Sequence, residues 1–261
     1  MADGGSLRTR IASGEVVIGT FLLAFPTVAA ARVAASVGAD YVLVDGEHTG
    51  FGWETMTPVL AATRAAGSVP FVRVPSASRQ NLALALDMGA TGLMVPMVGT
   101  AEEARAIASW ARYPPEGIRG TMFGLAAHDF AEVEPVAAMR KANDEVIIMV
   151  QIETVEGLEN VEEIAAVDGV DVLWVGHFDL TTSMGIPTEF TNPLYLDALD
   201  RVAAAGRASG KAVGFLASGA EDAVSLVERG FRVLAYGSDI GIYRSALRSG
   251  LGAVRQAVEG A

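Results

Sequence analysis

Residues 146–180 read VIIMVQIETVEGLENVEEIAAVDGVDVLWVGHFDL, and they contain two short apolar runs with a helical segment between them. The runs Val146–Val150 and Val172–Val175 are rich in β-branched residues, which is typical of buried parallel strands. Residues 156–166 have helical spacing. The pattern predicts a βαβ unit, whose two parallel strands end on the same edge of a sheet.

An acidic residue follows each of these strands, Glu153 after the first and Asp179 after the second. Two carboxylates at one sheet edge suit an oxygen-preferring divalent cation, so we expect Glu153 and Asp179 to be metal ligands. Both residues also have structural alternatives. Glu153 could cap the helix that begins near Thr154, and Asp179 could cap a turn before Thr181.

The composition narrows the class of protein. With 261 residues, 51% of them hydrophobic, the chain suits one large domain with a substantial core. It has no cysteine, which excludes disulfides and cysteine nucleophiles, and its net charge of −12 argues against nucleic acid or an anionic membrane as a partner. Apolar stretches such as Val16–Ala24 are too short to span a bilayer, and residues 1–10 lack the apolar core of a signal peptide. We therefore expect a cytoplasmic protein.

Eight apolar runs alternate with helical segments along the chain. The expected strands cover residues 16–22, 41–44, 71–72, 92–95, 146–150, 172–175, 213–216 and 232–236. This order predicts a single (β/α)8 TIM barrel over residues 1–261, with its active site at the C-terminal ends of the strands. An open doubly wound sheet is the alternative, but its G-x-G-x-x-G fingerprint is missing after the first strand. Residues 113–134 form a long irregular excursion, and loops of that length are usually functional or mobile.

The ends of the expected strands carry a small set of polar residues, namely Asp45, Glu47, His48, Arg73, Gln151, Glu153, His177, Asp179, Ser218 and Asp239. The three histidines of the chain (His48, His128 and His177) all fall in loops expected to follow strands, although a single loop histidine can simply be solvated.

Two groups in this set are candidates for acid/base and electrostatic roles. His48 follows Asp45 by three residues and could form an acid/base pair with it, while Glu47 could compete for that role. Arg73 could neutralise an oxyanion, or it could form a structural ion pair with Asp87.

Lysine is scarce, and its placement excludes one mechanism. The two lysines, Lys141 and Lys211, precede strands and are expected on the face opposite the active site. A Schiff-base mechanism needs a desolvated lysine inside the site, so we do not expect one. No glycine-rich phosphate cradle follows the seventh strand, and Asp239 at the start of the last helix would repel phosphate unless it only caps that helix.

Six ordered motifs resemble the HpcH/HpaI aldolase family of class II pyruvate aldolases: VDGEH (44–48), RVP (73–75), DMGATGLMVPMV (87–98), YPPEGIRG (113–120), QIET (151–154) and GHFDL (176–180). The resemblance covers nearly the whole chain. It implies that Glu153 and Asp179 bind Mg²⁺, Mn²⁺ or Co²⁺ and that Arg73, supported by Asp87, stabilises an enolate. It also implies that His48 paired with Asp45 transfers protons.

The resemblance further assigns the substrate site and the assembly. Gln151 would lie beside the bound pyruvate unit, and backbone groups near Gly176 would hold its carboxylate. His177, Phe178 and Leu216 complete the residues expected to bind substrate. The family implies a homohexamer, a trimer of dimers, with the last helix exchanged between subunits.

Two segments depart from the family pattern. Relatives commonly read G-P-x-D-L where this chain has Gly176-His177-Phe178-Asp179-Leu180, so His177 and Phe178 could reshape the site or add a proton donor. The segment between Arg119 and Arg140 has no arginine or lysine, where relatives that take long dicarboxylates often place a basic residue. A buried distal carboxylate would then be uncompensated, which favours a smaller or neutral aldehyde.

These observations predict a metal-dependent aldolase that reversibly cleaves 4-hydroxy-2-oxo acids to pyruvate or hydroxypyruvate and an aldehyde. The metal and Arg73 would stabilise the enolate, and His48 would act as the base, directly or through a metal-bound water. The alternatives are a citrate-lyase-like enzyme acting on an acyl-CoA substrate and a metal- and oxo-acid-binding barrel without turnover.

Overall fold

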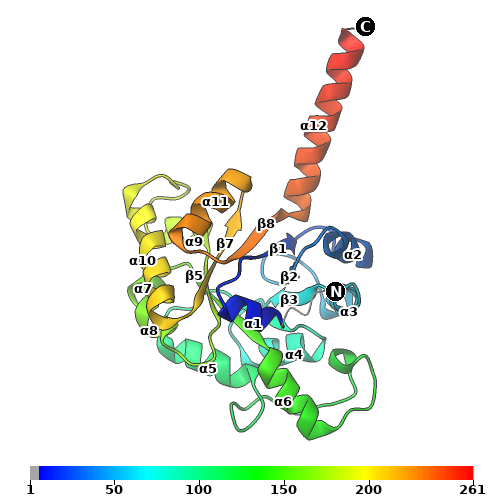
Figure 1. The fold of residues 1–261 in the computed structure, drawn as a ribbon, viewed down its shortest axis with the longest axis vertical. Helices are drawn as coiled ribbons and strands as arrows, with labels where there is room; N and C mark the ends of the chain where they lie inside the picture. The colour runs from blue at the N-terminus through cyan, green and yellow to red at the C-terminus, as the bar shows by residue number, and fades with distance from the viewer. Residues whose placement is uncertain (1–5, 261) are drawn as a thin grey trace.

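The computed structural model describes residues 6–260, in which eight parallel strands close into a barrel surrounded by helices (Figure 1). Residues 1–5 of the N-terminal segment considered above and residue 261 lie outside the described part. The strands are β1 (Val17–Leu22), β2 (Tyr41–Asp45), β3 (Val69–Arg73), β4 (Gly92–Val95), β5 (Ile147–Ile152), β6 (Val172–Val175), β7 (Ala212–Ala217) and β8 (Val233–Ser238). Each pairs with the next in sequence and β8 closes on β1, so the predicted TIM barrel is confirmed and the open sheet is wrong.

Helices follow the strands in the expected alternation. They are α1 (Leu7–Ala12), α2 (Val28–Ser36), α3 (Trp53–Ala65), α4 (Arg79–Asp87), α5 (Ala101–Ala111), η1 (Ala126–His128, a 3-10 turn), α6 (Pro135–Glu145), α7 (Val155–Glu159), α8 (Val161–Ala165), α9 (His177–Ser183), α10 (Pro193–Ser209), α11 (Ala220–Arg229) and α12 (Asp239–Glu259). No helix among residues 6–260 has the length and apolar content needed to cross a membrane.

The core has two layers because successive side chains of a strand point to opposite faces of the sheet. Inward residues such as Tyr41, Phe71, Met94 and Trp174 fill the barrel, and Leu7 and Ile11 of α1 pack in the same interior cluster. Outward residues make a larger cluster with the surrounding helices. The barrel interior is therefore solid below the level of the polar strand ends.

The long excursion after α5 returns to the N-terminal end of the barrel. Arg64, near the end of α3, donates hydrogen bonds to the carbonyl oxygens of Gly89 and Ala126, at 3.1 and 3.0 Å. Since Gly89 lies just before β4, this contact holds η1 at the end of the barrel where the strands begin. The expectation that His128 follows a strand is therefore wrong.

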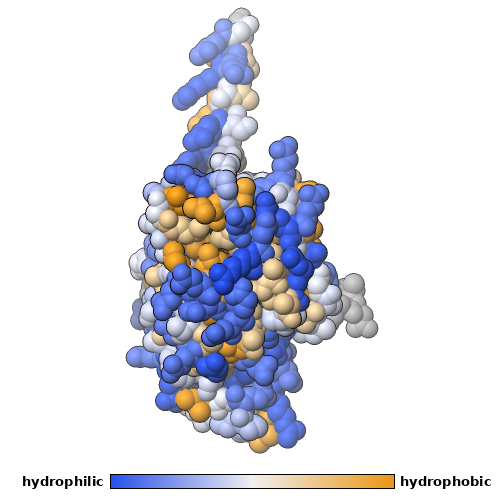
Figure 2. Space-filling model, turned by 90° about the vertical axis from the view of Figure 1, so that its left-hand side faces the viewer, coloured by the Kyte–Doolittle hydropathy of each residue, from blue (hydrophilic) through white to orange (hydrophobic). Residues whose placement is uncertain are grey.

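The last helix leaves the barrel instead of packing against it. α12 projects away from the body, and none of its residues is buried (Figure 1). In the space-filling view it carries both hydrophobic and hydrophilic side chains with no neighbouring element over it (Figure 2). This helix is the element expected to be exchanged between subunits.

Candidate active site

Polar side chains gather where β2, β3, β5 and β6 end. Asp45 ends β2, Arg73 ends β3, Gln151 lies at the end of β5 with Glu153 just beyond it, and Asp179 lies in the first turn of α9 after β6. Parallel strands deliver these residues to one rim of the barrel, as the sequence predicts.

Arg73 is held by two carboxylates. Its Nε and Nη2 donate to Oδ1 and Oδ2 of Asp45 at 2.7 and 2.9 Å, a bidentate pair in which Asp45 is fully buried. Its Nη1 lies 3.2 Å from Oε2 of Glu47. The guanidinium also lies 5.6 Å from the ring centroid of Phe21, an inward residue of β1. These contacts fix a cation at the mouth of the barrel.

The expected pairing of Asp45 with the His48 ring is wrong. Asp45 accepts the backbone N–H groups of Glu47 and His48 at 3.0 and 3.3 Å, so both of its oxygens are used by Arg73 and by the loop. The largely exposed His48 ring instead places Nε2 3.6 Å from Oε2 of Glu47. Glu47, which the sequence named only as a competitor, is the acidic neighbour of the histidine.

Glu153 is a buried carboxylate with both oxygens engaged. It is 2% exposed, Oε1 accepts the backbone N–H of Met97 at 2.7 Å, and Oε2 accepts Nε2 of Gln151 at 2.7 Å. The pKa of Glu153 is raised to about 7, mainly by burial and also by the charges of Glu47 and Asp179, against the opposing effects of the Met97 amide and Arg73. The cap alternative is wrong, since Thr154 caps α7 by accepting the Gly157 amide.

Two neighbours of Glu153 were not expected from the sequence. Met97 has a left-handed backbone (φ 59°) that aims its amide at the carboxylate, and a main-chain donor leaves no signal in a residue pattern. A Cβ added to Gly176 would lie 2.1 Å from Oε2 of Glu153. Glycine at position 176 is therefore required by the close approach of the β6–α9 turn to this carboxylate.

The rim carboxylates form a region of excess negative charge. Burial raises the pKa of Glu47, which Arg73 and His48 lower and the charges of Asp45 and Asp179 raise further. Asp179 is exposed and lies within the first turn of α9 rather than ahead of a turn. The charges of Glu47, Glu153 and Asp179 therefore act on one another across the barrel mouth.

The oxygen ligands of this region are of the type that a hard cation prefers, but the side chains alone are too few to hold one. Oxygen donors dominate, and Oε1 of Gln151 is buried with no hydrogen-bond partner. Within residues 6–260, however, no three His, Asp or Glu side chains are grouped so that they alone could hold a metal ion. A bound cation would thus need substrate or water oxygens in addition to Glu153 and Asp179.

Asp87 does not support Arg73 within this chain. α4 begins after the C-terminal end of β3 and runs back, so Asp87 at its last position lies at the opposite end of the barrel. There its Oδ1 accepts Nη2 of Arg119 at 2.7 Å, and the Arg119 guanidinium lies 4.5 Å from the ring centroid of Tyr113. Both the predicted Asp87–Arg73 ion pair and the supporting role in the same chain are wrong.

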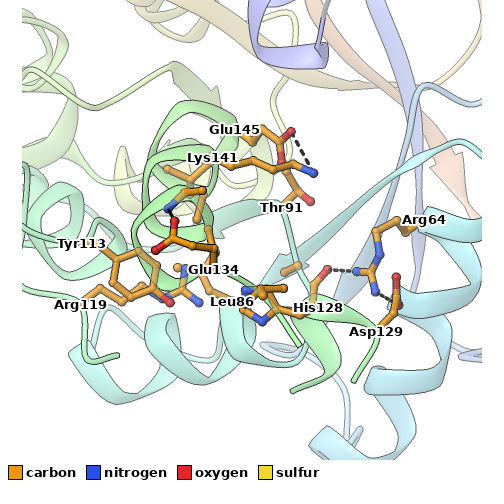
Figure 3. A pocket seen from close by; sticks show the side chains of 18 residues that line it. Arg64, Leu86, Thr91, Tyr113, Arg119, His128, Asp129, Glu134, Lys141 and Glu145 are labelled. Atoms are coloured by element: carbon orange, nitrogen blue, oxygen red, sulfur yellow. Dashed lines mark hydrogen bonds and ion pairs between the residues drawn. The ribbon is translucent and has the colours of Figure 1, made fainter. Parts of the chain in front are cut away.

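Arg119 and Tyr113 line a cavity of about 510 Å³ (Figure 3). The cavity opens beside α6 and η1, with Lys141 and Glu145 on one wall and Arg64 paired with Asp129 on another. It lies at the end of the barrel where β4 and β5 begin, far from the rim carboxylates. The size of this cavity does not make it the active site.

His177 points away from the barrel interior. Its ring stacks on Phe215 with centroids 5.1 Å apart and meets Phe190 edge-on at 5.4 Å. Phe215 belongs to the outer core layer, so His177 lies among the helices, where burial lowers its pKa. Phe178 is more than half exposed, whereas Leu216 packs against the barrel interior. Of the predicted substrate-binding side chains on β6–β7, only Leu216 faces the interior.

The lysines lie where the sequence predicts. Lys211 precedes β7, and Lys141 lies in the second half of α6 before β5, so both are at the end opposite the rim. Neither can reach a substrate at the barrel mouth of its own chain.

Comparison with known proteins matches residues 18–246 to the family model described as HpcH/HpaI aldolase/citrate lyase. The chain is 38% identical over 231 residues to the hydroxypyruvate/pyruvate aldolase of Delftia acidovorans, covering 88% of this chain and 86% of that one. It is also 38% identical over 216 residues to the 5-keto-4-deoxy-D-glucarate aldolase of Citrobacter koseri, with 82% and 83% coverage. The crystal structure of an HpcH/HpaI aldolase from Desulfitobacterium hafniense superposes with a TM-score of 0.90 at 31% identity and covers 97% of each chain.

Proposed function

Because the chain belongs to the HpcH/HpaI aldolase/citrate lyase family, we propose that it is a metal-dependent aldolase cleaving 4-hydroxy-2-oxo acids to pyruvate or hydroxypyruvate and an aldehyde. Its relatives are aldolases, and the chain is a carbon–carbon lyase. The observation that carries the finer proposal is the barrel mouth, where Arg73 and His48 face the carboxylates of Glu47, Glu153 and Asp179.

Glu153 and Asp179 would hold the divalent cation, which would supply the Lewis acid that a keto acid needs to accept negative charge. The chain's own residues prepare that position. Met97 and Gln151 hold the two oxygens of Glu153, which fixes the direction of its carboxylate. The excess negative charge around Glu47 favours a cation over a second anion at this position.

Cleavage moves one proton and one electron pair. His48 takes the proton of the C4 hydroxyl, the C3–C4 bond breaks, and C4 leaves as an aldehyde carbon. The electron pair of the broken bond enters the pyruvate unit as an enolate. Arg73, rigidly paired with Asp45 and Glu47, stabilises the enolate oxygen, and the enolate then takes a proton at C3.

The relatives support pyruvate or hydroxypyruvate as the nucleophile half of the substrate, since one of them is named a hydroxypyruvate/pyruvate aldolase. For the aldehyde we infer a short or neutral compound. Arg73 is already paired with two carboxylates, so a second acidic group on the aldehyde gains no unpaired charge from it. The excursion without arginine or lysine after Arg119 lies at the opposite end of the barrel and does not bear on the rim of its own chain.

The assembly is part of the same proposal. Each strand of a TIM barrel is normally covered by a helix, but α12 leaves Ile18 of β1 and Tyr236 of β8 exposed by 46% and 49%. α12 itself carries an apolar stripe, Tyr243, Leu247, Leu251, Val254 and Val258, at helical spacing. An exchanged α12 from a second copy covers both surfaces, and a homohexamer built as a trimer of dimers is the assembly we propose, acting in the cytoplasm without nucleic-acid or membrane partners.

Proton exchange at C3 of pyruvate tests the reaction without knowledge of the aldehyde. In D₂O with Mn²⁺ or Mg²⁺, the protein exchanges the methyl protons of pyruvate, chelation stops the exchange, and Arg73→Lys slows it about 100-fold because the paired planar guanidinium is lost. Arg79→Lys, an exposed arginine at the start of α4, is the matched control and keeps the wild-type rate.

Two outcomes oppose the proposal. Absence of exchange with every divalent metal favours a binding barrel without turnover. Loss of activity after borohydride treatment in the presence of pyruvate establishes a Schiff base and overturns the lysine argument.

A further inference from the structure

Asp239, the first residue of α12, is bonded mainly to a different segment of the chain. Its Oδ1 accepts the backbone N–H of Leu23 at 2.9 Å, and its Oδ2 accepts those of Ala24 and Phe25 at 3.0 and 2.6 Å. Ala24 also lies 3.2 Å from Oδ1, and the amide of Ile240 donates to Oδ1 at 2.7 Å. Three consecutive amides of the β1–α2 loop thus converge on one carboxylate.

The cap of α12 does not explain these bonds. Ser238 is the N-cap, and its side chain accepts the amide of Gly241 at 3.3 Å. Successive backbone N–H groups that converge on one point make an anion-binding nest, and bonds from amides to a carboxylate are stronger than neutral ones. In this chain the nest is filled by its own Asp239. The Asp239 carboxylate therefore links the β1–α2 loop to the last helix.

The β1–α2 loop, which is bound by Asp239, borders the barrel mouth. Leu23 packs against the interior cluster, as does Leu216 at the end of β7. Phe21, two residues before Leu23, is the ring that lies beside the Arg73 guanidinium. A shift of the β1–α2 loop would therefore move an apolar part of the mouth next to the proposed substrate site.

Asp239 also lies at the base of the projecting helix α12. The main contacts of α12 with the body are with β1 and β8. Phe25 of the loop meets Tyr243 of the helix edge-on, with ring centroids 5.6 Å apart. Gly237, two residues before Asp239, has a left-handed backbone (φ 57°) that directs the chain from β8 into α12. Asp239 and the Phe25–Tyr243 contact thus join helix and loop.

We propose that Asp239 is a positioning residue that holds the β1–α2 loop over the barrel mouth and sets the direction in which α12 leaves the barrel. A second copy that receives α12 then stabilises, through Asp239, the loop at the mouth of the chain that donates the helix. The effect on turnover rests on the proposed reaction and the effect on the assembly rests on the proposed exchange of α12, whereas the effect on the loop rests on neither.

Asp239→Asn tests this in the full-length protein. The amide keeps one acceptor and turns an NH₂ group toward the loop donors, so hydrogen exchange of the Leu23, Ala24 and Phe25 amides accelerates about tenfold or more. The assembly dissociates at higher protein concentration than wild type, measured by sedimentation. With pyruvate as substrate, KM rises more than kcat falls, because the mouth is displaced while His48 and Arg73 remain.

Glu134→Gln is the matched control. Glu134 also uses both oxygens to accept backbone amides, those of Val136 and Ala137 at the start of α6, but it lies away from the rim. We expect the Glu134→Gln variant to leave the hydrogen exchange of residues 23–25, the assembly and KM unchanged. If Asp239→Asn does not fold, Asp239→Ser, which still accepts from Ile240 but is too short for the loop, replaces it.

Unchanged exchange at residues 23–25 in the Asp239 variants, or an equal change in Glu134→Gln, overturns the proposal. Exchange and sedimentation need no turnover, so failure of the aldolase assignment leaves this test intact. Conversely, an active aldolase whose Asp239→Asn variant keeps a rigid loop and a wild-type assembly refutes the positioning role alone.

Discussion

The ionisable side chains at the barrel mouth are largely shielded from water and held by fixed partners. Glu153 carries an acidic group where water hardly reaches, and it keeps its orientation through one main-chain donor and one glutamine. Arg73 is similarly confined, between the fully buried Asp45 and the half-buried Glu47. Buried charges persist only when paired or hydrogen-bonded, so small changes beside them have large effects.

Gly176→Ala changes one atom next to Glu153. The new Cβ cannot lie 2.1 Å from Oε2, so the carboxylate or the β6–α9 turn must move. We expect kcat/KM to fall about 100-fold or more and the affinity for Mn²⁺ to fall with it, because the proposed metal and substrate positions depend on this carboxylate.

Gly219→Ala is the control for this change. Gly219 is the N-cap of α11, another rim helix, and its Cβ would meet nothing within 4 Å. Its activity and Mn²⁺ affinity stay within about twofold of wild type. Equal kinetics in the two variants, measured by steady-state assay and metal titration, would contradict the packing argument.

Glu153→Gln tests the cost of the buried charge. Because burial raises the pKa of Glu153 to about 7 from an ordinary 4.5, the folded protein binds more protons than the unfolded chain between these values. The free energy of unfolding of the metal-free protein therefore falls as pH rises from about 4.5 to about 7. An uncharged glutamine fits at position 153 if the side-chain amide of Gln151 turns over. Oε1 of Gln151, which has no partner in the wild type, then accepts the NH₂ group of the new glutamine.

We expect Glu153→Gln to gain roughly 1 to 3 kcal/mol relative to wild type between pH 5 and pH 8 without metal, while losing activity. Urea unfolding of both proteins at several pH values measures this difference. A pH-independent difference between the two proteins would show that Glu153 ionises normally in the folded state.

Among the elements, α12 differs from every other helix of the barrel. Its sequence has the apolar periodicity of a helix that packs, yet none of its residues is buried. On the outward faces of β1 and β8, Ile18 and Tyr236 are about half exposed. Helices of this kind gain most of their stability from tertiary packing, which is the physical reason for the proposed exchange of α12.

Leu247→Glu places a charge in the apolar stripe of α12. We expect the assembly to dissociate and the melting temperature to fall by several degrees, because an unpaired carboxylate would be buried on assembly. Arg248→Glu, the neighbouring position on the same helix, should retain the assembly. Sedimentation and thermal unfolding distinguish them, and an unchanged assembly in Leu247→Glu would show that the stripe stays in solvent.

Over the whole molecule, the two ends of the barrel are built differently. The end where the strands begin is closed by α1, whose Arg8 pairs with Asp171 at 2.9 Å, and it carries both lysines and the 510 Å³ cavity. The other end carries the rim carboxylates, Arg73 and His48. This division follows from the direction of the strands, because all eight run the same way.

The barrel and the list of residues at its rim follow from the order of residues along the chain. Short β-branched runs alternating with helices specify parallel strands, and a residue that directly follows such a strand must lie at its C-terminal end. Asp45, Arg73, Gln151, Glu153 and Asp179 were placed by this rule alone. Local order along the chain was sufficient because each of these positions depends only on the strand it follows.

Which of these groups meet became clear from the folded chain. Asp45 binds Arg73 rather than the His48 ring, Asp87 faces Arg119, and His177 turns toward the outer core layer. The amides that hold Glu153 and Asp239 belong to main chain far away in sequence. Such partners depend on packing across the barrel and on backbone direction, and neither is written in the identity or spacing of the residues themselves.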